Sequence, residues 1–314
     1  MIRMIRSRLI GLILVLFGVT ILSFLLSNLS SIDQAEAYAR NTFLHPTPEQ
    51  IEEIRVEMGF HLPLHQQYFN WLSNSLQGDL GTSVLTRNQV TEDIAQKLPA
   101  TMLLVGMALL WIILLSIPIG LICALKKDSF FDHLVRGGTI LGASLPNFWL
   151  AFLLLFLLAV SFPIFRVVDY GNIKSLILPS FVLALPVACL SIRLFRATIL
   201  SNLNEDYIVY AKARGIRTSR IVWGHVLKNS LPPIVTLFFQ YIGNLIAGSA
   251  IVESIFSLKG IGMHLVDAIL ARDLPTINGC VLIIALIFVC SRSLAEVINM
   301  LLNPSMVERE EILL

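Results

Sequence analysis

The stretch Glu205–Pro233, EDYIVYAKARGIRTSRIVWGHVLKNSLPP, is a polar and basic island between two long apolar parts of the chain. Its acidic start and its central glycine predict a helix, a left-handed bend at Gly215 and a second helix. We expect Asn204 to cap the first helix, and Pro232-Pro233 to end the second, which begins near Thr218. Two short capped helices suit a surface that another protein holds; the alternative is a solvated loop.

The sequence around this island is that of an integral membrane protein. Of its 314 residues, 56% are hydrophobic and 14% are charged, against about 25% charged in soluble proteins. Six segments reach the ~20 apolar residues that a spanning helix needs. They are roughly residues 9–29, 100–125, 139–162, 176–196, 233–254 and 277–301. The predicted fold class is therefore an all-α membrane protein with six transmembrane helices.

The distribution of Lys and Arg predicts the orientation of these helices. Basic residues cluster at 3–8, 126–136 and 193–228, which become cytoplasmic if the N-terminus is inside. Both termini and the island are then cytoplasmic. The first apolar segment is longer than a signal-peptide core, so we interpret it as an uncleaved span. The chain divides into residues 1–29 (N-terminus and first span), 30–98 (extracellular), 99–302 (membrane domain, coupling helices at about 204–231) and 303–314 (cytoplasmic tail).

The extracellular segment 30–98 is the largest part of the chain expected outside the membrane, and it carries an acidic excess. Thr47-Pro48-Glu49-Gln50 has the pattern of a capping box with proline in the first helical position, which predicts a helix to about Met58. A second amphipathic helix is expected near 65–76. The segment is too small for a catalytic domain and suits a docking surface or a cap.

The chain lacks the common sequence signatures of catalysis. It has no phosphate-binding Gly-x-x-x-x-Gly-Lys-Ser/Thr loop, no His-Glu-x-x-His and no Gly-x-Ser-x-Gly. His61 and His65 are four residues apart, but Pro63 between them argues against a metal-binding helix, and we predict no metal site. The four cysteines lie in or at the ends of apolar segments and are expected to be free.

A few polar side chains interrupt the apolar segments. Arg292 and Glu296, one helical turn apart, are expected to neutralise each other. Gln240 and Asn244 lie among small residues of the fifth segment, a pattern that fits close helix packing and a polar path equally well. With Asn147 in the third segment, they are our candidates for the translocation path.

Several motifs occur together in an order that resembles a known family. They are Tyr210-Ala-Lys-Ala-Arg-Gly-Ile216 with Leu231-Pro232, Gly78-Asp-Leu-Gly-Thr-Ser83, Leu98-Pro-Ala-Thr101, Leu145-Pro-Asn-Phe-Trp-Leu-Ala151, Ile177-Leu-Pro179 and Asn303-Pro304. Over nearly the whole chain they resemble the B-type permease of the oligopeptide, dipeptide and nickel group of ABC importers, with a lean towards the nickel branch. One departure is Lys259-Gly260, where the family usually has Pro-Gly.

The resemblance implies the type I ABC importer fold in a bacterial inner membrane. It implies a second, C-type permease, two ATPase subunits and an extracellular binding protein as partners, and nickel, probably chelated, or short peptides as cargo. The chain itself would bind no cofactor and would not be an enzyme, because the partner ATPases use the ATP and Mg. The ATPase would hold the coupling helix through Glu205, Asp206, Tyr210, Ala211, Ala213, Arg214 and Gly215.

Two other classes of protein compete with this interpretation. An ion-coupled secondary transporter would use a proton gradient to take up its cargo. Its uptake would continue after ATP depletion and would stop when the proton gradient collapses. An intramembrane enzyme would need a paired nucleophile and base, which we do not find in the sequence.

Overall fold

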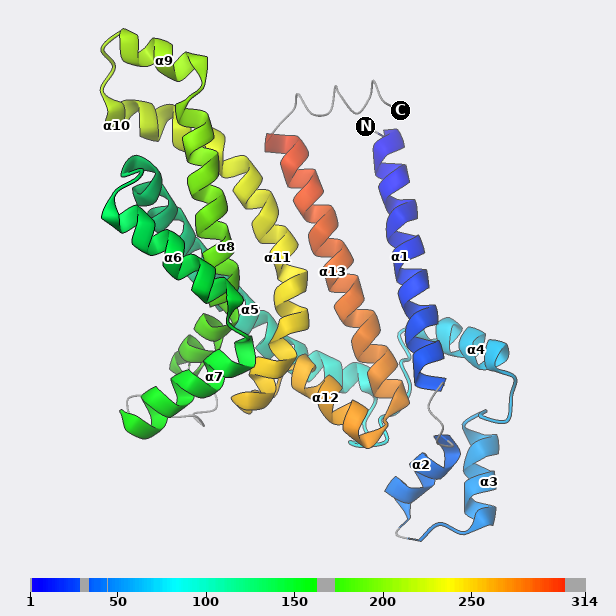
Figure 1. Cartoon of the computed structure of the whole chain (residues 1–314). Coiled ribbons are helices and arrows are strands. Elements are labelled where there is room, and N and C mark those ends of the chain that lie inside the picture. The colour runs from blue at the N-terminus through cyan, green and yellow to red at the C-terminus, as the bar shows by residue number, and fades with distance from the viewer. Residues whose placement is uncertain (1, 29–33, 44, 163–172, 303–314) are drawn as a thin grey trace. The chain divides into compact units, whose positions relative to one another are not determined.

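The computed structural model describes residues 2–28, 34–43, 45–162 and 173–302, and throughout these residues the regular structure is helical (Figure 1). The predicted tail, residues 303–314, lies outside them. The helices are α1 (Ile2–Asn28), α2 (Gln34–Thr42), α3 (Pro48–Glu57), α4 (Leu64–Leu76), α5 (Val90–Leu125), α6 (Phe130–Ser144), α7 (Asn147–Leu155), α8 (Ile177–Leu203), α9 (Asp206–Ala213), α10 (Thr218–Ile221), α11 (Leu227–Ile255), α12 (Ile261–Ala271) and α13 (Leu274–Leu302). Two π-helical turns (Phe156–Ser161 and Val222–Val226) and a 3₁₀ turn (Ile173–Leu176) adjoin them.

Among the described residues, 4 helical stretches are long and apolar enough to cross a membrane: Val90–Leu125, Ile173–Leu203, Ser219–Ile255 and Leu274–Asn299. A fifth results if α6 and α7 together form one bent span. The described apolar part of α1, Ile10–Leu25, is shorter than these. The all-helical membrane class is thus confirmed, with four to five candidate spans.

The third predicted span, 139–162, is wrong as a single straight helix. The chain breaks after Ser144, and the axes of α6 and α7 differ by 102°. Leu145 adopts extended backbone (ψ 126°) and Pro146 takes the N-cap position of α7. Proline lacks the amide that would continue α6 and disfavours helical backbone in the residue before it, so the break falls at this dipeptide.

The helices form two compact units, the first from residues 1–101 and 258–289. The predicted helices at 47–58 and 65–76 are confirmed as α3 and α4, and Thr47 forms the full capping box with Gln50. In this unit α1 packs on α4, with the Thr20 and Tyr68 hydroxyls 2.9 Å apart. One cluster of buried side chains joins α5, α12 and α13: Leu80, Val90, Ile94, Ile261 and Cys280. The helix α12 was not predicted from the sequence.

Two buried aspartates hold the 78–89 loop in the first unit. Asp273 accepts hydrogen bonds from the Ser83 hydroxyl (2.5 Å) and the Leu85 amide (3.2 Å). Asp93, at the start of α5, accepts hydrogen bonds from the Thr86 hydroxyl and from the Asn88 side chain. Because both carboxylates are desolvated, these bonds fix the loop firmly against α5 and the turn between α12 and α13.

His264 on α12 lies beside this network, with Nε2 3.8 Å from a carboxylate oxygen of Asp93. Its side chain is buried, and burial lowers the pKa of His264, an effect that Lys97 reinforces and Asp93 opposes. The lowered pKa favours the neutral imidazole, so the Asp93 carboxylate is stabilised mainly by the hydrogen bonds from Thr86 and Asn88 and by Lys97 at 3.5 Å.

The second unit consists of residues 102–257 and 290–314. In it, α8 lies against α6 and α11, and α9 and α10 lie side by side at the end of α8 (Figure 1). Arg292 and Glu296 on α13 are neighbours at 3.8 Å, as predicted. The cysteines are free, also as predicted; Cys123, Cys189 and Cys280 are buried and Cys290 is exposed.

We predict that Gly279→Ala destabilises the first unit. A Cβ at Gly279 would lie 2.7 Å from the Val90 side chain and 3.3 Å from that of Leu80. Overpacking of this kind costs roughly 1–3 kcal/mol of unfolding free energy, measurable by thermal unfolding of the purified protein. Val90→Ala, added to Gly279→Ala, should recover part of the loss. Gly106→Ala is the matched control, because nothing lies within 4 Å of that position; equal effects of both alanines would contradict the prediction.

Candidate functional site

The island between α8 and α11 is ordered, but its first helix begins later than predicted. α8 continues to Leu203, and Asn204 is its C-cap rather than the N-cap of the next helix. The carbonyl of Glu205 accepts the amides of Ile208 and Val209, so Glu205 holds the N-cap position of α9. Asp206 is then the acid in the first turn of α9, where its negative charge interacts favourably with the positive end of the helix dipole.

Gly215 ends α9 as the sequence predicts. Its φ is +75°, in the left-handed region that glycine adopts without strain. The Ile216 amide donates to the Ala211 carbonyl at 3.2 Å, the long bond of a Schellman motif. Ala211 and Ile216 both pack against the underlying core, so the bend also fastens the end of α9 to the second unit.

The second predicted helix does not stop at Pro232-Pro233. After α10 the chain forms the π turn Val222–Val226 and continues as α11 through both prolines to Ile255. Two prolines leave the carbonyls of Lys228 and Asn229 without helical partners. Both of these residues are exposed, so water can satisfy their carbonyls and the helix continues.

A buried cluster at the end of α8 holds the island in place. Ile208, Ile221 and Val226 have no exposed surface and pack on Phe195 and Ile199 of α8. A polar bond adds to this contact, since the Asn202 side chain donates to the Ser230 hydroxyl at 2.9 Å. The island is therefore a rigid extension of α8 and α11, not a solvated loop.

The opposite face of the island presents apolar and aromatic side chains to the surroundings. Tyr210 and Trp223 are 66% and 67% exposed, and Tyr207 and Val209 are also exposed. The Arg214 guanidinium lies 5.8 Å from the centre of the Tyr210 ring. Exposed large apolar residues with a cationic neighbour are typical of interface anchors. Of the other predicted coupling residues, Glu205, Asp206, Ala213 and Gly215 are exposed and Ala211 is half-buried.

The candidate path residues lie on two elements of the second unit. Asn147 is the first residue of α7, and its amide nitrogen lies 3.8 Å from where a Cβ at Gly248 of α11 would stand. Gln240 and Asn244 are exposed and one turn apart on α11. Asn147 thus meets α11 one turn beyond Asn244, and the three amides are distributed along this part of the unit.

The acidic excess of the outer segment is concentrated on one helix. Glu49, Glu53 and Glu57 are exposed at four-residue intervals on α3, so they form a stripe along one face. Glu52, off this stripe, bonds to Arg55 at 3.0 Å.

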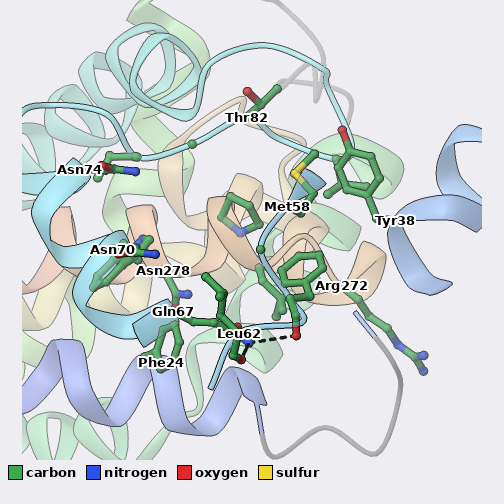
Figure 2. Close-up of a pocket in the computed structure, with 18 residues that line it drawn as sticks. Phe24, Tyr38, Met58, Leu62, Gln67, Asn70, Asn74, Thr82, Arg272 and Asn278 are labelled. Carbon is green, nitrogen blue, oxygen red and sulfur yellow. Dashed lines mark hydrogen bonds between the residues drawn. The ribbon is translucent and has the colours of Figure 1, made fainter. Parts of the chain in front are cut away.

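The first unit also contains a cavity of about 360 Å³ that the sequence did not reveal (Figure 2). In Figure 2 the amides of Asn70, Asn74 and Asn278 lie on one side of it, and Tyr38 and Met58 lie on another. Gln67 donates to the carbonyls of Phe60 and Leu62 and shapes the adjoining turn. The residues come from segments far apart in the chain, which is why no local pattern marks the cavity.

Within the part of the chain that the structure describes, no group of three His, Cys, Asp or Glu side chains could hold an ion.

Comparison with protein families decides the class. Residues 116–308 match the family described as the binding-protein-dependent transport system inner membrane component, and residues 1–105 match the N-terminal membrane component of the same systems. The chain belongs to this permease family. The permease is 33% identical to the di/tripeptide transport system permease protein DppB of Pseudomonas aeruginosa. The matched region covers 97% of this permease and 98% of DppB.

Two further relatives carry different substrates in their names. The metal-staphylopine import system permease protein CntB of Staphylococcus aureus is 33% identical, over 92% of this permease and 93% of CntB. The glutathione transport system permease protein GsiC of Escherichia coli is 32% identical, over 97% of this permease and 99% of GsiC. The family is thus confirmed over almost the entire chain.

We predict that Gly215→Val abolishes association of the permease with an ATPase subunit without preventing its insertion in the membrane. No atom lies within 4 Å of a Cβ at Gly215, so the cost arises from the left-handed backbone, which strains a β-branched residue by roughly 1–3 kcal/mol. The measurement is co-purification of the ATPase with tagged permease.

Gly224→Val is the matched control for this experiment. Gly224 is also an exposed glycine of the island with nothing within 4 Å, but its φ is not positive. Normal amounts of assembled complex with Gly215→Val would show that the bend is not needed for docking.

Proposed function

We propose that this permease forms half of the translocation path of an ATP-driven importer and that the island is its contact with the ATPase. The observation that carries the proposal is the island itself, with one face built into the core at Ile208, Ile221 and Val226 and the other exposing Tyr210 and Trp223. A rigid surface of this kind can transmit the movement of a bound partner to α8 and α11 without deforming. Glu205, Asp206, Tyr210, Ala211, Ala213, Arg214 and Gly215 are the proposed contact residues.

The proposed topology has six spans, with both termini in the cytoplasm of a bacterial cell and the chain in its inner membrane. It counts α1 as one span and the bent pair α6 and α7 as another, beside the four long stretches. The family description as an inner membrane component supports this location, and the basic residues of the island support the orientation.

The proposed assembly contains a second permease, two ATPase subunits and a binding protein outside the membrane. The family's dependence on a binding protein supports the last of these. The chain lacks a phosphate-binding loop, which supports a division of labour in which partner subunits bind ATP and Mg and this chain performs no covalent chemistry.

The proposed cargo is a short peptide. The names of DppB and GsiC support peptides, and the amides of Asn147, Gln240 and Asn244 suit a ligand with many hydrogen-bonding groups and little net charge. A metal chelate, including chelated nickel, is the second candidate, favoured by the name of CntB and by the motif at 145–151. A chelate would bring its own ligands, which fits the absence of a metal-binding group among the described residues.

We predict that cells expressing the whole complex accumulate labelled dialanine, and that unlabelled di- to pentapeptides compete with it. ATP depletion should abolish the uptake, whereas collapse of the proton gradient alone should not. Parallel assays use free nickel and nickel with histidine as an amino-acid chelator. Uptake of chelated nickel with no response to peptides would replace the peptide assignment by the second candidate, and uptake that follows the proton gradient would indicate a secondary transporter instead.

We predict that the stripe of Glu49, Glu53 and Glu57 helps to seat the binding protein. If each exposed charge contributes roughly 0.2–1 kcal/mol, changing all three to Gln raises the Kd of the binding protein for the complex by about threefold or more at low salt. Surface plasmon resonance with the complex in nanodiscs measures this Kd. Glu92→Gln, which removes an exposed charge elsewhere, serves as control; a Kd unaffected by the triple change would make the stripe a solvated face.

A further inference from the structure

A buried ion pair joins α6 to α8 in the second unit. The guanidinium of Arg196 donates to the carboxylate of Asp132 through Nε and one terminal nitrogen, each bond being 2.6 Å long. The Asp132 side chain has no exposed surface, and that of Arg196 is 16% exposed. Asp132 also accepts the amide of Asp128 at 3.0 Å, so the carboxylate fixes the turn before α6 as well. The pair lies outside both the island and the candidate path residues.

Arg196 stands on the part of α8 that supports the island. Its neighbours Phe195 and Ile199 belong to the buried cluster beneath α9 and α10, and Asn202, further along α8, bonds to Ser230 of α11. Since α8 is one continuous helix through these positions, a displacement of the island must displace Arg196 with it.

Asp132 stands on the helix that leads to the bend. α6 runs beside α8 from Asp132 to Ser144, where the chain turns by 102° into Asn147 and α7 (Figure 1). The two helices meet again at Gly142, where an added Cβ would lie 2.6 Å from the sulfur of Cys189. The pair and this close approach therefore fasten α6 to α8 at two separated points.

We propose that Asp132 and Arg196 are positioning residues that couple the island to the path. The pair fastens α6 to α8, so that movement of the island is conveyed to the bend at Leu145-Pro146 and to Asn147. This inference rests on the proposed function, because it takes the island to be the ATPase contact. A bidentate guanidinium–carboxylate pair suits such a link, since its two parallel bonds fix orientation as well as distance.

The test uses the complete importer in proteoliposomes, with ATP hydrolysis and uptake of labelled dialanine measured on the same preparation. Asp132→Asn and Arg196→Gln should assemble with the ATPase and hydrolyse ATP, but transport at least tenfold less cargo per ATP. Arg196→Lys, which keeps the charge and loses the bidentate geometry, should fall between them and the wild type. The matched control is Arg193→Gln, an exposed arginine one turn earlier on α8, which should behave as wild type.

A second measurement needs no cargo. Spin labels at Leu141 on α6 and Ser201 on α8, both exposed, are placed in a Cys290→Ser background. The distance between the labels should stay constant when ATP is added to the wild-type complex and should change when ATP is added to Asp132→Asn. This variant also remains informative if its uptake is too low to measure.

The two measurements separate failure of this inference from failure of the proposed function. Normal transport per ATP in Asp132→Asn and Arg196→Gln, or an unchanged label distance in Asp132→Asn, would overturn the role of the pair while leaving the importer intact. A wild-type permease that binds no ATPase, or wild-type uptake of dialanine that needs no ATP, would instead overturn the proposed function.

Discussion

The cost of an unpaired backbone group in hydrocarbon constrains this chain more than any single contact. A helix satisfies its own amides and carbonyls, so apolar segments of the length found here become helices whatever their detailed sequence. Departures from regular helix are then costly, and the structure places them where polar partners or solvent meet the chain. The left-handed Gly215 and the two prolines of α11, which follow the exposed Lys228 and Asn229, are two such places, and both lie in the island.

Apart from the short helix α12, which was missed, the helical form of the apolar segments could be predicted from the sequence, because length and composition decide it locally. The response of each proline could not. Pro146 ends α6, whereas Pro186 and Pro232 lie inside continuous helices, although all three lack the same hydrogen-bond donor. The difference depends on what surrounds the flanking turns: α6 is held to α8 on one side of the break and α7 packs on α11 on the other. Such contacts join residues far apart in sequence and leave no local pattern.

At the candidate site, too, the features set by local sequence could be predicted, and those set by tertiary contacts could not. The bend at Gly215 could be predicted, since only the backbone of that residue and the helix before it are involved. The face of α9 that is buried could not be, because α9 has apolar or aromatic residues on both sides: Ile208 is buried while Val209 and Tyr210 are exposed. The choice is made by the shape of the cluster at the end of α8. The cavity of the first unit, lined by α1, α4, the 78–84 loop and the start of α13, is a further feature that only the tertiary structure reveals.

The Asp132–Arg196 pair illustrates how stability and mechanism can favour different solutions. A buried ion pair often contributes little net stability, because the desolvation of both charges offsets their attraction, and well-packed apolar residues can replace it without loss. The close contact of Gly142 with Cys189 shows that α6 and α8 already pack tightly without charge. What the ion pair adds to this packing is a directional constraint, because its two parallel hydrogen bonds weaken when one helix rotates against the other. α8 has 27 residues and is about 40 Å long at 1.5 Å per residue. A small tilt of the α8 axis at the island therefore becomes a large displacement at the other end of the helix. The directional bond of Arg196 lies close to the island, where the displacement is still small, and it makes α6 follow the movement of α8.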